Sequence, residues 1–375
     1  MILAADRILF PDADAPAAGW LEVEGDHVVA AGLGSPPRPA DEHLDGIVAP
    51  GYVDVHCHGG GGASFVTEDP DVARHVLAVH LGRGTTTMVA SLVTGSIPDL
   101  ARQTATLAGL VESGELGGVH LEGPWLCKKY KGAHPADLLT DPTPETVAEL
   151  IAAGRGAVRM VTIAPERPGA MDAVAQLAEA GVVVAVGHTD VDFDACQAAI
   201  EAGARGATHL FNAMAPLRHR DPGPVLALWE DPRVYLELIM DGVHVRPELV
   251  AFVMATEPGR VVLVTDAMGA ACADDGDYVL GELPVEVREG VARIAGTDTI
   301  AGSTLTLDAA VRHCVAAGVP LAQAVRSATA IPADYLGLTE VGRLAPGKRA
   351  DLVVLDEELQ VTRVLQRGRW LTASA

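Results

Sequence analysis

Two hydrophobic patterns divide the chain. Between residues 53 and 339, short apolar runs rich in β-branched residues alternate with Ala-rich stretches of helical spacing, which is typical of βα units around a parallel sheet. Stretches such as 71–84, 146–156, 170–181 and 194–204 have glycine at or near their ends and predict crossover helices. The apolar runs predict eight strands, a number that closes a (β/α)8 barrel, at residues 53–58, 85–92, 117–123, 158–165, 182–189, 206–213, 234–242 and 261–268.

The two ends of the chain have a different texture. Residues 1–49 and 340–375 contain short strand-like runs that are interrupted by turn residues. We expect both ends to form one small β-sandwich domain, with the barrel domain at residues 50–339. After the eighth barrel strand, residues 278–294 predict a hairpin insertion with its turn at 288–290.

The composition narrows the range of functions. A formal net charge of −23 and a pI near 4.8 argue against nucleic acid or an anionic membrane as a partner. The five cysteines are scattered and form no C-x-x-C pair, which fits a reducing cytoplasm. No run approaches the roughly 18 apolar residues of a membrane span. We therefore expect a cytoplasmic protein. Two short basic segments, residues 128–131 and 218–220, stand out against its acidic composition.

The first predicted strand carries the leading candidate for chemistry. His56 and His58 alternate with apolar residues, so a strand directs both imidazoles to one face, about 6 to 7 Å apart. Such a pair can bind one metal ion, although it also arises by chance on exposed strands. The chance alternative weakens because further ligands follow other predicted strands, where barrel enzymes place reactive groups. These ligands are Glu122, His188, His209 and Asp266.

Neighbouring residues of the same types have a simpler interpretation. His75 and His80 lie in a predicted helix and are interpreted as packing or surface residues. His120 lies two residues before Glu122 on the same predicted strand, so its side chain points to the same face but one layer deeper in the barrel. We expect it at most to support the metal ligands and not to bind metal itself. Cys57 should face the helices rather than the metal. The donor set of imidazoles and carboxylates favours Zn²⁺ or Fe²⁺ over Mg²⁺ or Ca²⁺.

Several short motifs resemble the amidohydrolase superfamily, and within it the N-acetylglucosamine-6-phosphate deacetylase branch. The resemblance covers essentially the whole chain. It implies a metal-dependent barrel with a sandwich made from both termini, in agreement with the hydrophobic pattern. The motifs are PGYVDVHCH at 50–58, HLEGP at 120–124, KGAH at 131–134, GHT at 187–189, HLFNAM at 209–214, DGVHV at 241–245, VTDAM at 264–268 and PGKRADLVVLD at 346–356.

The resemblance also implies roles for individual residues. Two divalent metal ions per subunit are expected, one held by Glu122 with His188 and His209, the other by His56, His58 and Asp266. Glu122 would bridge the two ions or bind one of them. Asp266 would also be the catalytic residue, acting as general base and then general acid.

The same resemblance implies a phosphorylated N-acetyl amino sugar as substrate. Arg220 would bind the phosphate, across the interface of a homodimer, because a guanidinium matches phosphate geometry. His134 would bond the sugar or its acyl oxygen. Further substrate contacts would come from Ala133, Asn212, Ala213, His244, Ile300, Ala301 and Gly302.

Alternatives remain open at this level. One alternative is that the substrate is an isomeric acetylated amino sugar phosphate or another amide, such as a cyclic one. The other is that the barrel is a non-catalytic scaffold. The loop at residues 125–130 departs from the pattern of the branch, which more often has Phe-x-Asn there. Its Cys127 is either a redox-sensitive lid residue or a small side chain in a flexible loop.

Overall fold

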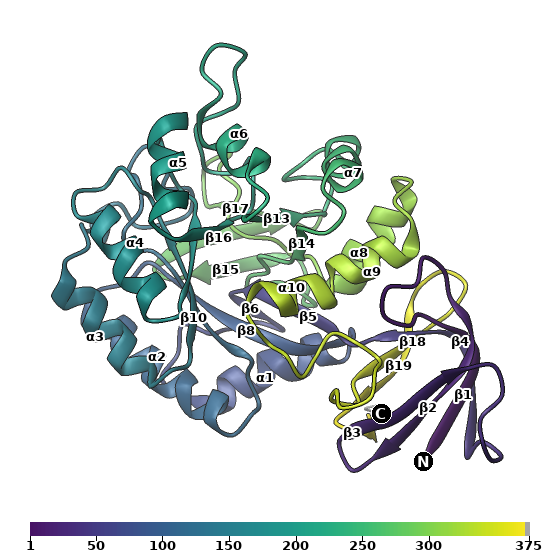
Figure 1. The fold of residues 1–375 in the computed structure, drawn as a ribbon. Coiled ribbons are helices and arrows are strands. Elements are labelled where there is room, and N and C mark those ends of the chain that lie inside the picture. The colour runs from purple at the N-terminus through teal and green to yellow at the C-terminus, as the bar shows by residue number, and fades with distance from the viewer. Residues whose placement is uncertain (372–375) are drawn as a thin grey trace.

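A computed structural model describes residues 1–371, and a (β/α)8 barrel dominates it (Figure 1). Neighbouring strands of the eight-stranded sheet pair in parallel. The first and last strands meet where Asp266 N donates to His56 O, at 2.8 Å. In sheet order the strands are β14 (Val261–Val264), β13 (Tyr235–Ile239), β12 (Ala204–Ala207), β11 (Val183–Val186), β10 (Val158–Ile163), β9 (Gly118–Glu122), β8 (Thr85–Val93) and β5 (Tyr52–Cys57).

All eight predicted strands are present, but β11, β12 and β14 end earlier than predicted. The sequence predicted them to residues 189, 213 and 268. The structure ends them at Val186, Ala207 and Val264. The chain turns there because residues two positions further on adopt positive φ angles, which a strand does not accommodate. This correction moves three predicted ligands from strands into the loops that follow them.

The helices surround the barrel on its outside (Figure 1). Several begin at a side-chain cap followed by proline, as Asp69, Ser96 and Thr143 do for the first three. The helices are α1 (Pro70–Leu81), α2 (Ile97–Glu112), α3 (Pro144–Gly154), α4 (Ala170–Glu179), α5 (Phe193–Ala202), α6 (Gly223–Glu230), α7 (Pro247–Thr256), α8 (Leu307–Ala316), α9 (Leu321–Ser327) and α10 (Ala330–Tyr335).

Both ends of the chain build one small seven-stranded sheet beside the barrel (Figure 1). It encloses a core of its own, to which Leu21 and Leu365 contribute. We propose residues 1–49 and 340–375 as one domain and 50–339 as the other; residues 372–375 lie outside the described chain. In sheet order the strands are β20 (Arg369–Trp370), β19 (Val361–Gln366), β18 (Leu352–Leu355), β4 (Glu42–Pro50), β1 (Ile2–Ile8), β2 (Ala17–Glu24) and β3 (His27–Leu33).

The predicted insertion is a three-stranded sheet rather than a single hairpin. Strands β15 (Gly276–Leu280), β16 (Leu283–Arg288) and β17 (Val291–Ile294) pair in sequence. The predicted turn at 288–290 is present, but a second turn at 281–282 adds a strand. The apolar face of this sheet packs on Val93, Ala133 and Met268 and so borders the barrel mouth. A short ribbon of β6 (Gly59–Gly60) and β7 (Ala63–Ser64) follows β5.

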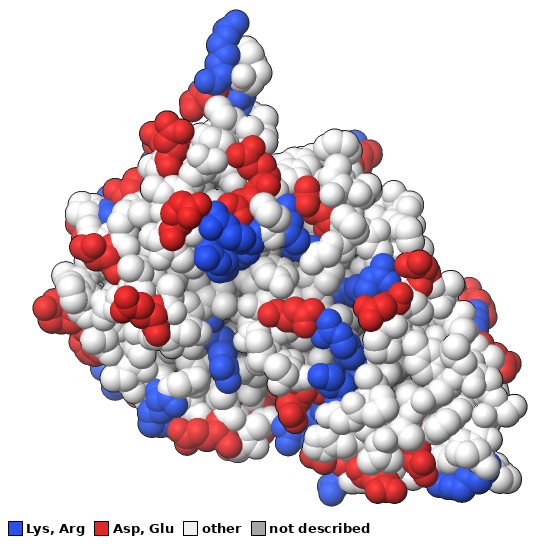
Figure 2. All heavy atoms as spheres, viewed as in Figure 1, with Lys and Arg blue, Asp and Glu red and all other residues white. Residues whose placement is uncertain are grey.

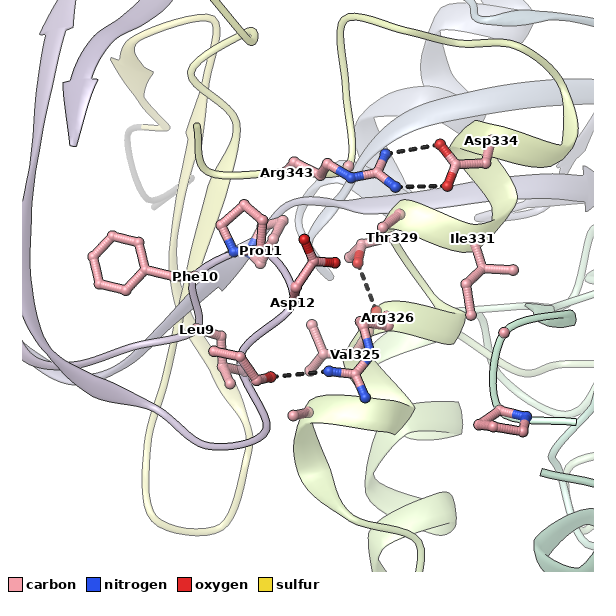
Figure 3. A pocket seen from close by; sticks show the side chains of 17 residues that line it. Leu9, Phe10, Pro11, Asp12, Val325, Arg326, Thr329, Ile331, Asp334 and Arg343 are labelled. Atoms are coloured by element: carbon pink, nitrogen blue, oxygen red, sulfur yellow. Dashed lines mark hydrogen bonds and ion pairs between the residues drawn. The ribbon is translucent and has the colours of Figure 1, made fainter. Parts of the chain in front are cut away.

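A cavity of about 290 Å³ lies where the loop after β1 meets α9 and α10 (Figure 3). Its arginines are engaged: Arg343 pairs with Asp334 at 2.6 and 2.8 Å, and Arg326 donates to Ala13 O at 2.9 Å. Pro50 and Gly259, which precede barrel strands, place this cavity at the N-terminal end of the barrel.

Across residues 1–371, every helix is too short or too polar to cross a bilayer.

Candidate metal centre and active site

The six predicted ligands occupy the C-terminal ends of five barrel strands. His56 and Glu122 lie within β5 and β9, and His58 directly follows β5. The remaining ligands each stand two residues beyond the end of a strand. Their φ angles are 49°, 30° and 48° for His188, His209 and Asp266. L-residues rarely adopt such angles, and strain of this kind concentrates at functional sites.

The first ligand group contains His56, His58 and Asp266, all buried. The two Nε2 atoms lie 3.1 Å apart. Asp266 Oδ1 is 3.2 Å from His58 Nε2 and 3.5 Å from His56 Nε2. Three donor atoms thus converge on one point from β5 and from the loop after β14.

The second group is centred on Glu122. Its Oε1 lies 3.0 Å from Nε2 of both His188 and His209, and these two nitrogens are 3.0 Å apart. His134 Nε2 is 3.4 Å from Glu122 Oε2 and belongs to the same buried cluster. Glu122 also joins the two groups, because its Oε2 is 3.1 Å from His58 Nε2.

The hydrogen bonds of the imidazoles show that the two groups fit metal ions. His56 Nδ1 lies 3.1 Å from Glu237 Oε2, and His58 Nδ1 lies 3.1 Å from the carbonyl oxygen of Ser91. His188 Nδ1 lies 2.9 Å from the carbonyl oxygen of Tyr130. Because these oxygens accept, each Nδ1 carries the proton and each Nε2 presents a lone pair. Two such nitrogens about 3 Å apart repel when both lone pairs are free, and a proton or a metal cation between them removes the repulsion.

Charge at the site supports the same interpretation. Burial raises the pKa of Asp266, but the nearby His56 and His58 outweigh burial and hold that pKa below its usual range. Burial, reinforced by His134, lowers the pKa of His188 to about 4. Burial opposes the charged form of the other three imidazoles, but Glu122 and Asp266 outweigh it and raise the pKa of His56 and His209, and that of His58 to about 8. Asp266 and His188 are thus already in the forms that bind metals at neutral pH, whereas a metal ion must displace protons from the other three rings.

A cavity of about 680 Å³ opens above these ligands. It is lined by most of the predicted substrate residues. Its walls come from the loops after the barrel strands and from the three-stranded sheet. The predicted residues in its lining are Ala133, His134, Asn212, Ala213, His244, Ile300 and Gly302.

Two predicted substrate residues do not line this cavity. Ala301 is fully buried in the core under the three-stranded sheet, and its N–H already donates to Ala292 O at 3.1 Å. Arg220 lies in the exposed loop between β12 and α6, which projects above the barrel (Figure 1). Figure 2 shows basic side chains at the tip of this projection.

Sequence reasoning missed the residues that hold the two histidines predicted to bind substrate. Thr94 Oγ1 lies 2.8 Å from His134 Nδ1, and Asp241 Oδ2 lies 2.6 Å from His244 Nδ1. Asp241 has a signal in the sequence, since it stands three residues before His244 in the DGVHV motif. Thr94 has none, because 40 residues separate it from His134.

The first basic segment and Cys127 lie in one loop at the site. Residues 128–131 line the cavity, where Lys129 pairs with Asp190 at 2.8 Å and Lys131 Nζ donates to His134 O at 3.1 Å. Cys127 is half-buried behind them, and its N–H donates to His188 O at 2.9 Å. Burial raises the pKa of the Cys127 thiol, which keeps it protonated at neutral pH.

The model of the Amidohydrolase family matches residues 47–371. Among characterised relatives, the N-acetylgalactosamine-6-phosphate deacetylase of Escherichia coli O157:H7 is 37% identical, with 98% of both chains covered. The human N-acetylglucosamine-6-phosphate deacetylase is 36% identical over 86% of this chain and 84% of its own.

Solved structures agree with the family match. The N-acetyl-D-glucosamine-6-phosphate deacetylase of Mycobacterium smegmatis is 50% identical, with a TM-score of 0.96, and 99% of this chain and 100% of that chain are covered. An aspartate-to-alanine mutant of it was solved with N-acetyl-D-glucosamine-6-phosphate. The Thermotoga maritima enzyme is 31% identical, with a TM-score of 0.90 and both chains fully covered. The chain belongs to the amidohydrolase family and is an enzyme of it.

Proposed function

We propose that the protein hydrolyses the N-acetyl group of N-acetylglucosamine 6-phosphate and releases acetate and glucosamine 6-phosphate. The observation that carries this proposal is the convergence of Asp266 and two buried ligand groups beneath a cavity lined by the motif residues. Full-length similarity to a 50% identical deacetylase supports the choice of substrate.

A second candidate substrate is N-acetylgalactosamine 6-phosphate. The relative from Escherichia coli O157:H7 that is named for this isomer matches 98% of this chain. Acetate release from the glucosamine, galactosamine and mannosamine isomers, measured with and without a chelator, tests both candidates. Hydrolysis of none of them by the metal-replete protein would contradict the proposal.

The proposed cofactors are two divalent ions, zinc or iron. His56, His58 and Asp266 would hold one ion, and Glu122, His188 and His209 the other. Imidazole nitrogens with carboxylate oxygens are the donors that these metals prefer. When bound, such ions lower the pKa of water toward about 7 and polarise an amide carbonyl.

Asp266 is the proposed acid-base catalyst. Its side chain is buried but reaches the cavity, and its ionised form can accept a proton from the attacking water. The water oxygen bonds to the acetyl carbon, the C–N bond breaks, and Asp266 returns the proton to the departing amine. His134, held by Thr94, would bind the sugar or the acyl oxygen.

The proposed assembly is a homodimer in which Arg220 of the partner subunit binds the phosphate. Support comes from the loop at residues 215–222, whose Leu217 is 46% exposed and which carries Arg220 away from its own cavity. Beside it, a row of aromatic rings runs from Phe211 through Trp229 to Phe252, which is 58% exposed. Exposed apolar groups with a neighbouring arginine are typical of protein interfaces. His244, Asn212 and Ala213 would complete the phosphate pocket within the subunit.

A further inference from the structure

A buried carboxylate inside the barrel has no part in the chemistry above. Glu237 lies in the middle of β13, and its side chain is fully buried. Within residues 1–371, His56 is its only ion-pair partner: Oε2 lies 3.1 Å from His56 Nδ1. Burying a carboxylate without a cationic partner costs several kcal/mol. The position of Glu237 therefore depends on positive charge at or beyond the ring of His56.

Neighbouring polar groups leave Glu237 as the acceptor for His56. The ring of His120 packs edge-on against that of His56, with centroids 4.6 Å apart. Both nitrogens of His120 face hydroxyls, Ser91 Oγ at 2.9 Å and Thr162 Oγ1 at 2.8 Å. These contacts tie His120 to its own partners. The Nδ1–H of His56 donates to Glu237, and its Nε2 lone pair points at His58 and Asp266.

A second contact fixes the carboxylate itself. The hydroxyl of Tyr335, in α10, donates to Glu237 Oε1 at 3.4 Å. This hydroxyl occupies space that only glycine leaves free on β12, since a Cβ on Gly206 would lie 1.8 Å from it. The last helix of the described chain thus reaches the first barrel strand through one buried carboxylate.

We propose that Glu237 is a positioning residue that sets the metal affinity of the His56, His58 and Asp266 group. It fixes the proton on Nδ1 of His56, orients the ring, and balances the charge of a bound ion with its own. Carboxylates that hold metal-binding histidines in this way change metal affinity by about 10- to 100-fold. The inference rests on the proposed two-metal site and adds to it that Glu237 affects the affinity for only one of the two ions.

The second ligand group provides an internal control. His188 is held by the backbone carbonyl of Tyr130, and His209 Nδ1 has no hydrogen-bond partner within residues 1–371. Neither imidazole of that group bonds to Glu237 through its ring, and in the described chain the one contact is the backbone N–H of His209, which donates to Glu237 Oε2 at 3.5 Å. A glutamine at this position can still accept that bond through its amide oxygen. Loss of the negative charge, with the acceptor oxygen kept, should therefore weaken binding of the ion at His56 and leave binding of the other ion unchanged.

The test measures the dissociation constant of Zn²⁺ by chelator competition for Glu237→Gln, which keeps the shape of the side chain without its charge. It is made in two backgrounds, each of which has lost one ligand group. In the His209→Ala background only the ion at His56, His58 and Asp266 remains, and Glu237→Gln should weaken its binding about 10- to 100-fold. In the His58→Ala background only the ion at Glu122 and His188 remains, and Glu237→Gln should not change its affinity. Thr208→Val is the matched control, because the Thr208 hydroxyl bonds Thr162 in the barrel interior and, within residues 1–371, makes no hydrogen bond to His56 or Glu237.

The outcomes separate this inference from the function on which it rests. Unchanged affinity in the His209→Ala background, or equal loss in both backgrounds, overturns the role of Glu237. A parent protein that binds one ion per chain overturns the two-metal site and this role with it. If Glu237→Gln does not fold, Tyr335→Phe replaces it. We expect that variant to weaken the same ion about 5-fold, and no change would overturn the inference.

Discussion

His188 and His209 face each other with their Nε2 atoms 3.0 Å apart, and both atoms lie 3.0 Å from the same oxygen of Glu122. The two histidines follow neighbouring strands, β11 and β12, at equal distances from the strand ends. Parallel strands bring such positions to one rim of the barrel. The pair is thus a direct product of the repeating βα unit, and it defines one half of the metal centre.

The metal centre predicts a dependence of activity on two ions. Dialysis against a chelator should abolish acetate release, and added Zn²⁺ or Fe²⁺ should restore it, because the Nε2 lone pairs then regain a cation. Elemental analysis of the reconstituted protein should give two ions per chain. A single ion at saturating metal would contradict the proposed pair of sites.

Asp266→Asn should lower kcat at least about 100-fold while metal ions stay bound. The amide keeps the shape of the carboxylate and one coordinating oxygen, but it accepts no proton from water. Steady-state kinetics with metal analysis of the same sample makes the measurement. Turnover near that of the parent would refute the acid-base role, whereas loss of metal would assign the defect to binding.

Arg220→Ala should raise KM for the phosphorylated sugar about 10-fold or more with little change in kcat, because a charge-assisted phosphate contact is lost. Arg218→Ala, in the same exposed loop, is the matched control. An unchanged KM would contradict the phosphate assignment.

Mixing subunits tests whether Arg220 acts across the interface. Asp266→Asn and Arg220→Ala proteins, each impaired alone, should regain activity when their subunits exchange. The heterodimer then joins an intact Asp266 with Arg220 of the partner subunit. The assay uses substrate concentrations far below the raised KM, where both parents are slow. Mixtures no more active there than the average of their components would place Arg220 outside the partner's site.

The cysteines should react in order of exposure and acidity. Burial raises the pKa of both Cys196 and Cys314 to about 12, so almost no thiolate forms at pH 8 and neither should react in the folded protein. Exposed Cys272 should be alkylated first, and half-buried Cys127 more slowly. Mass spectrometry of the modified protein reads the order. Loss of activity in step with Cys127 modification would favour its role as a lid residue, and unchanged activity the simpler alternative.

The sequence was sufficient for the barrel and for the convergence of its ligands. Alternation between apolar runs and helical stretches is a local property, and it located all eight strands. It did not locate the ends of β11, β12 and β14. There, the positive φ angles of His188, His209 and Asp266 end the strand, and no residue type in the sequence marks such angles. The extra strand of the insertion was missed although its turn, at 281–282, contains Gly281 with a φ of 58°, because one glycine within an apolar run also fits a strand.

The amino-acid order by itself determined which side chains stand at the ends of parallel strands, because the βα repeat carries that information along the chain. The tertiary structure alone decided what surrounds them. It buried Ala301, moved Arg220 away from its own cavity, and set Glu237 against His56 across 181 residues. Such contacts depend on how segments far apart in the sequence pack against each other, and no local pattern of residues encodes that packing.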